Sequence, residues 1–125
     1  MQKNFKIGLY GSDIEKETEA CINILIDSNT SSVMVHNEEF SIKIIIPDIV
    51  DLGCFKDLLD KKEKKLRLLS HLKKGEKTYK GKKKFLWKDD RIVFSQGAVR
   101  FEFDELVIEE FKKIVRVIEE SYNRV

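Results

Sequence analysis

The sequence predicts an α+β fold in which antiparallel β-meanders carry two helices, at about 51–74 and 104–122, packed as a single layer of helices on a sheet. Short runs of alternating apolar and polar residues occupy much of 5–46 and 85–103, and each set is followed by a stretch of helical periodicity. Strands grouped ahead of a helix are typical of antiparallel sheets rather than of βαβ units. The length of 125 residues fits one domain, 1–125.

The first meander begins with a strand at 5–10, where apolar residues alternate with Lys or Gly. A short apolar run at 33–36 predicts another strand, and an Asn-Glu-Glu turn leads from it into 40–46. Proline cannot donate a hydrogen bond to a sheet, so Pro47 ends this strand.

The stretch 13–26 is ambiguous between helix and strand. Ser12 followed by Glu15 matches a helix capping box. Against a helix, isoleucines recur at every second position up to residue 26, and β-branched residues favour strands. We expect a strand at about 18–26, with the helix as the open alternative.

The region 51–74 is predicted to be a long helix because its large apolar residues recur at close to 3.6 positions. Gly75 then stands where a C-terminal glycine cap belongs. The residues of the apolar stripe are Phe55, Leu58, Leu59, Leu66, Leu69 and Leu72.

The C-terminal part is predicted to contain a basic loop at 75–84, three short strands and a final helix. Turn-forming residues separate the strands 85–87, 91–94 and 99–103, which suggests two consecutive hairpins. The helix begins near Asp104, and its apolar residues share one face.

Charge is strongly segregated along the chain although the net charge is only +2. The segment 61–88 contains 13 Lys and Arg against two acids, whereas acids outnumber cations in both flanking segments. Lysines that neutralise phosphates and aromatic rings that stack on bases are the two components of single-stranded nucleic-acid binding. The candidate binding residues are Lys73, Lys74, Lys77, Tyr79, Lys80, Lys82, Lys83, Lys84, Trp87 and Lys88.

We therefore expect a small non-enzymatic binding module that uses the basic face at about 61–88 to bind nucleic acid non-specifically. The alternative is a protein-interaction or inhibitor module, of the immunity or anti-defence type, that binds an acidic protein partner, because a bipolar charge pattern also steers protein association. A third reading is structural: the aromatic rings point into the core and the lysines only keep the surface solvated.

No catalytic residue, metal site or cofactor is predicted. If Cys54 and His71 share one helix, 17 residues place them roughly 25 Å apart, too far for a nucleophile and its base. The possible zinc ligands are spaced by 15 or more residues, whereas structural zinc sites pair ligands a few residues apart. The segment 75–83 has five residues between its glycines, and a phosphate-binding P-loop needs four. The possible zinc ligands are Cys21, His36, Cys54 and His71.

A cytoplasmic location without membrane contact is expected. The N-terminus lacks the apolar segment of a secretory signal, and no apolar run approaches the roughly 20 residues of a membrane span. Two cysteines are fewer than a disulfide-stapled secreted domain usually has, so both are expected to be reduced thiols. The sequence leaves the oligomeric state open.

Overall fold

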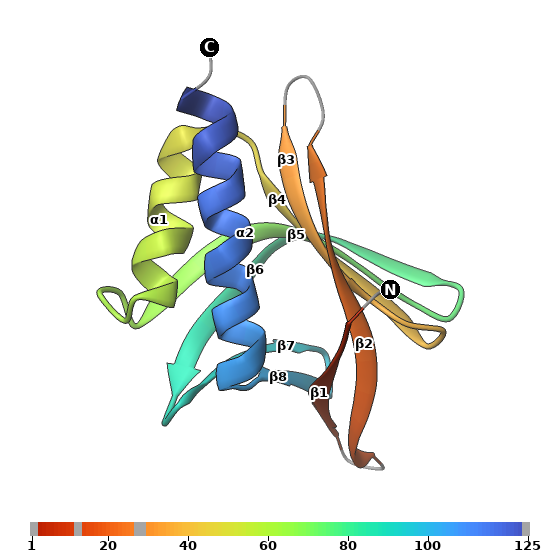
Figure 1. The fold of residues 1–125 in the computed structure, drawn as a ribbon. Coiled ribbons are helices and arrows are strands. Elements are labelled where there is room, and N and C mark those ends of the chain that lie inside the picture. Colours follow the sequence, from red (N-terminus) through yellow and green to blue (C-terminus); the bar gives the residue numbers. More distant parts are fainter. Residues whose placement is uncertain (1–2, 12–13, 27–29, 124–125) are drawn as a thin grey trace.

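The computed structural model describes residues 3–11, 14–26 and 30–123, which form a strongly curved antiparallel sheet with two helices against one side (Figure 1). In chain order the elements are β1 (Asn4–Tyr10), β2 (Glu15–Ile26), β3 (Ser31–His36), β4 (Phe40–Ile46), α1 (Ile49–Leu59), β5 (Lys65–Lys74), β6 (Lys77–Lys88), β7 (Arg91–Gln96), β8 (Val99–Phe103) and α2 (Glu105–Asn123).

The sheet closes into an eight-stranded barrel, and this corrects the expected fold class. Consecutive strands pair antiparallel, and β1 also pairs with β8, from Ile7↔Phe103 to Tyr10↔Arg100. The sequence predicted meanders under a single layer of helices. Alternation reveals that a strand has one buried face, but this pattern is the same in an open sheet and in a barrel. The alternation pattern therefore cannot reveal that the first strand pairs with the last.

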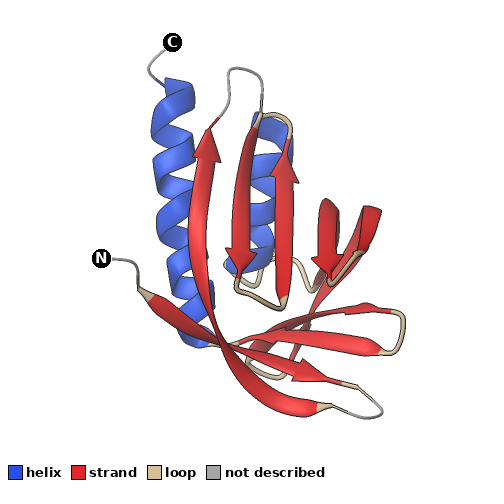
Figure 2. Cartoon of the chain, turned by 90° about the vertical axis from the view of Figure 1, so that its right-hand side faces the viewer, coloured by secondary structure: helices blue, strands red, loops and turns tan. Residues whose placement is uncertain are grey.

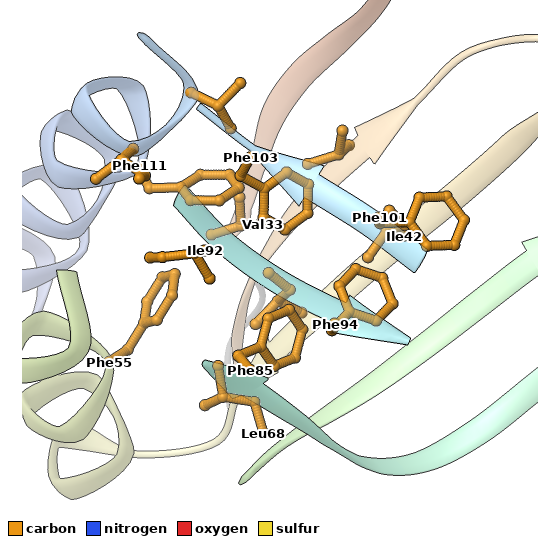
Figure 3. Packing of buried hydrophobic residues seen from close by; sticks show 14 of the residues in the cluster. Val33, Ile42, Phe55, Leu68, Phe85, Ile92, Phe94, Phe101, Phe103 and Phe111 are labelled. Carbon is orange, nitrogen blue, oxygen red and sulfur yellow. The ribbon is translucent and has the colours of Figure 1, made fainter. Parts of the chain in front are cut away.

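The two helices lie side by side and cover the inner face of the sheet (Figures 1 and 2). The ring of Phe111 on α2 lies 5.9 Å from that of Phe55 on α1 and 5.4 Å from that of Phe103 on β8, measured between centroids. Deeper in the barrel, Phe94 stacks on Phe101 at 4.9 Å. Figure 3 shows these rings converging on one core. Core packing occupies the inner face, so the outer face of the sheet is the one that meets solvent.

The helix expected over 51–74 is wrong beyond Leu59. The helix α1 starts where the Asp48 carboxylate accepts a hydrogen bond from the backbone N–H of Asp51 at 2.9 Å. It ends just before Lys61, which adopts a left-handed φ of 61°. An α-helix cannot continue through such a residue. After this turn, the strand β5 occupies the second half of the expected helix.

The sequence around β5 fits both periodicities, which explains the error. Leucines at 66, 69 and 72 match a helical stripe, whereas 66, 68, 70 and 72 match the alternation of a strand. The barrel buries the second set: Leu68 is 3% exposed and Leu72 is 1% exposed. Packing against the rest of the sheet therefore decided between two locally acceptable structures.

The basic loop expected at 75–84 is also wrong, because most of it belongs to β6. Gly75, with a φ of 63°, lies in the tight turn between Lys74 and Lys77 and does not cap a helix. Lysine has a low intrinsic preference for strands. The strand forms because each of its residues from Lys77 to Leu86 has a partner in β5.

The remaining secondary-structure predictions are confirmed. The strand favoured at 18–26 is the second part of β2, and those at 5–10, 33–36 and 40–46 correspond to β1, β3 and β4. The two hairpins link β6, β7 and β8, and α2 follows Asp104, whose carboxylate accepts from the Val107 N–H at 3.1 Å. Ser12 of the possible capping box lies outside the described residues.

Neither described helix combines the length and the apolar composition that a bilayer crossing requires.

Candidate nucleic-acid interface

Strand alternation places five cations on the outer face of the β5–β6 hairpin, in the rows between the pair Arg67↔Lys84 and the pair Lys73↔Thr78. In β5 the even-numbered side chains from Leu66 to Leu72 face the core and the odd-numbered ones face outward. In β6 the outward positions are the even-numbered ones. We call the resulting exposed set the hairpin face; it consists of Arg67, Lys73, Lys80, Lys82 and Lys84.

The register of the hairpin brings these cations together. Arg67 is directly opposite Lys84, and Lys80 is directly opposite His71. Directly opposite side chains on one face have Cβ atoms about 5 Å apart. The like charges of Arg67 and Lys84 therefore repel in the free protein, and an anion bound between them would relieve the repulsion.

A third strand extends the hairpin face. Lys43 of β4 is the partner of His71 in β5, so Lys43, His71 and Lys80 form one row across three strands. The pKa of His71 is held below its usual value, first by burial and then by the positive charges of Lys80, Lys43 and Lys83. The lowered pKa of this imidazole therefore reflects its burial first and the neighbouring positive charges second.

Acidic side chains border the face near the start of α1, and Glu38 and Glu39 line a shallow pocket together with Lys73. The pKa of Asp51 is raised by burial and by its contacts with Asp48, and the charge of Lys82 opposes that increase. The described residues form ion pairs elsewhere on the molecule, and none of these pairs uses a cation of the hairpin face. The face therefore keeps its positive charge.

Lys83, a predicted binding residue, is not on this face. It points inward and is 7% exposed. Its ammonium donates hydrogen bonds to the carbonyl oxygens of Ser70 at 2.9 Å and Tyr79 at 3.2 Å. The bond to Ser70 links β6 to β5, the bond to Tyr79 lies within β6, and both hold the ammonium inside the protein.

The two aromatic residues predicted to stack on bases also face inward. Tyr79 and Trp87 are half-buried and pack against the hydrophobic core. The indole N–H of Trp87 donates to the Leu58 carbonyl at 2.6 Å, at the end of α1. The ammonium of Lys61 lies 4.5 Å from the centre of the indole ring. The outer face of the hairpin therefore presents positive charge, and neither of these two rings is placed there to stack on a base.

The other predicted residues lie at the ends of the hairpin. Lys74 and Lys77 are paired at its tip, and Lys88 is paired with Arg91 at the far end of β6. A shallow pocket of about 330 Å³ lies beside the tip, lined among others by His36, Phe40 and Lys73.

Sequence reasoning did not single out Arg67, Lys43 and His71, which the structure places on or beside the hairpin face. The signal for Arg67 and His71 was the alternation of polar and apolar residues along 67–73, which the helical interpretation of that segment concealed. Lys43 has no local signal, since its place in the row depends on the pairing of β4 with β5.

The predicted separation of Cys54 and His71 assumed that both residues lie on one helix, whereas Cys54 lies on α1 and His71 on β5. Cys54 lies exposed on α1 and His71 lies on the outer face of β5, with no hydrogen bond between them. Cys21 and His36, by contrast, are direct partners across β2 and β3. His36 is hydrogen-bonded to Asn23 at 2.7 Å. Within the described residues, no three side chains of the metal-ligating types group together.

No family model, no curated protein and no solved structure matches this chain. The geometry and charge of the hairpin face are therefore the basis of the functional proposal.

Proposed function

We propose that the protein binds the phosphate backbone of nucleic acid, without sequence preference, through the hairpin face. The observation that carries this proposal is the set of five exposed cations on one side of two paired strands, none of them used in an ion pair between described residues. Neutralising phosphates releases condensed counterions, which is the main source of non-specific affinity.

The geometry of the face favours contacts with the backbone over contacts with bases. Successive outward residues of a strand are about 6.6 Å apart, so Lys80, Lys82 and Lys84 form a regular row along β6. Such a row can follow the phosphates of one nucleic-acid strand. Because Tyr79 and Trp87 are turned inward, we expect duplexes to bind at least as well as single strands.

The test is fluorescence anisotropy with labelled duplex and single-stranded DNA over a range of salt concentrations. Five phosphate contacts predict a slope of log K against log[salt] of about −4.5 on duplex DNA. Replacing two cations in Lys82→Glu/Lys84→Glu should weaken binding to every sequence and reduce the slope to about −2.7 or less.

The matched control is Lys113→Glu/Arg116→Glu, which makes the same change of charge at two exposed positions of α2. It should leave the slope close to that of the native protein. No detectable binding at low salt, or equal losses in the two double variants, would reject the hairpin face as a nucleic-acid site.

A second candidate function is the binding of an acidic protein, and Leu69 is the observation in its favour. This half-buried leucine lies on the hairpin face directly opposite Lys82. Phosphate contacts do not need an apolar residue there, whereas a protein surface would bury it. Leu69→Ser should therefore leave DNA binding unchanged but weaken binding to an acidic protein.

A further inference from the structure

One edge of β2 lacks a partner strand in the described part of the chain. β2 has 12 residues, and its two halves use opposite edges: 15–21 pair with β1, and 21–26 pair with β3. At 22–26 the edge that faces away from β3 is therefore a row of backbone N–H and C=O groups with no described strand beside it. Figure 2 shows β2 as the outermost strand at this end.

This edge has the composition of an interior strand. Exposed edges are usually protected by charged residues, proline or a bulge. The segment 20–26 contains neither charge nor proline, whereas the half of β2 that pairs with β1 contains three glutamates and one lysine. Leu25 is 45% exposed and Ile26 is 52% exposed. A long apolar edge of this kind favours the addition of another strand.

The neighbouring flank of α2 provides a second apolar contact. Val117 is 48% exposed and Leu106 is 70% exposed, and both belong to one stripe of the helix, together with Glu110 and Lys113. This stripe faces the β1–β2 side, because Leu106, Glu110 and Lys113 line a shallow pocket together with residues of both strands. The opposite flank faces α1, where Lys56 pairs with Glu119.

We propose that two copies of this chain associate by antiparallel pairing of β2 with β2, around a two-fold axis at Ile24. In this register Ile22 opposes Ile26 on the inner face and Asn23 opposes Leu25 on the outer face. Every opposing pair joins uncharged side chains, so the segment is complementary to itself. A closed two-fold contact of this kind uses the same patch on both copies.

A second copy fits this surface better than an extended peptide does. A single added strand would occupy the backbone edge and leave Val117 in water. A whole second protein would place its own α2 beside the first, so that the two Val117 side chains lie on adjoining flanks of the interface. The contact is separate from the hairpin face and is independent of nucleic-acid binding.

The experiment is sedimentation velocity of the full chain over a wide concentration range. The native protein should dimerise, and Leu25→Lys/Ile26→Lys should be monomeric with an unchanged circular dichroism spectrum, since both side chains are already about half exposed. The control is Ile49→Lys/Val50→Lys on α1, where the residues are 57% and 70% exposed. This control should still dimerise.

A monomeric native protein at every concentration would overturn the proposal. So would equal dissociation of both lysine variants, since that would point to general apolar association.

The register is tested by cross-linking in a Cys21→Ser/Cys54→Ser background. Asn23→Cys/Leu25→Cys places thiols directly opposite each other across the two-fold axis, within the Cα separation that a disulfide spans. Mild oxidation should give a covalent dimer. Leu25→Cys alone has no thiol opposite it and should stay monomeric on a denaturing gel. Equal cross-linking of both variants would exclude pairing around Ile24.

Discussion

The ammonium of Lys83 is held between two backbone carbonyls inside the wall of the barrel. It takes part in none of the ion pairs of the described residues. Burial lowers the pKa of Lys83 below its ordinary value, because the charged form loses its hydration. The side chain therefore has a structural role in joining β5 to β6.

Lys83→Met tests this role through the pH dependence of stability. At a pH below 10.5, the ordinary lysine value, the unfolded chain holds this proton more tightly than the folded protein does. The free energy of unfolding of the native protein should therefore rise, relative to that of Lys83→Met, as the pH increases from neutral towards 10.5. Urea unfolding of both proteins across this range measures the difference, and parallel profiles would contradict the assignment.

If nucleic acid binds at the hairpin face as proposed, the pKa of His71 should report it. Burial, followed by the nearby cations, lowers its pKa in the free protein. A phosphate bound along the row of Lys43, His71 and Lys80 would stabilise the imidazolium and raise the pKa. We expect affinity for DNA to increase as the pH falls through the raised pKa, and to lose this dependence in His71→Gln. An NMR titration with and without DNA measures the shift, and an unchanged pKa in the saturated complex would place the ligand elsewhere.

At the level of elements, β6 holds the turn between α1 and β5. The backbone N–H of Trp87 donates to the Lys64 carbonyl at 2.9 Å, and its indole N–H donates to the Leu58 carbonyl. One residue of β6 thus fixes both the end of α1 and the approach to β5. This is why the tryptophan is turned away from the lysines next to it in sequence.

Trp87→Phe should lower the free energy of unfolding by about 1 kcal/mol, since it removes one hydrogen bond and leaves the Leu58 carbonyl without it. The affinity for DNA should not change, because the ring does not belong to the hairpin face. Urea unfolding and anisotropy on the same sample test both statements. Weaker binding at unchanged stability would mean that the indole contacts the ligand.

The prediction of individual elements succeeded where the local pattern allowed one structure and failed where it allowed two. The segment 40–46 alternates from Phe40 to Ile44, is rich in isoleucine and is followed by proline, and its assignment as a strand is confirmed. Between 65 and 74 the leucines satisfy both periods, and β6 consists largely of residues that do not favour strands. The pairing of these two segments with each other stabilises both as strands.

At the level of the whole molecule, the barrel separates the charges that the sequence places in blocks. Outward glutamates at 15, 17 and 19 lie in the half of β2 that pairs with β1. The hairpin face lies beyond β3 and β4 in the strand order. The 13 cations of 61–88 do not all share one surface. Some lie in the turn after α1 and Lys83 is buried, so the contiguous basic surface is smaller than the charge count predicts.

The sequence by itself determined the local properties: most strands, the C-terminal helix, the positions of the hairpins after β6 and the segregation of charge. These depend on side-chain periodicity and turn chemistry within a few residues. Only the tertiary structure decided that β1 meets β8, that 65–74 is a strand and that Lys43 joins the row of His71 and Lys80. Each of these features depends on which distant segment a strand pairs with. The stabilisation from such a pair depends on residues in both strands, so the local pattern of one strand does not determine it.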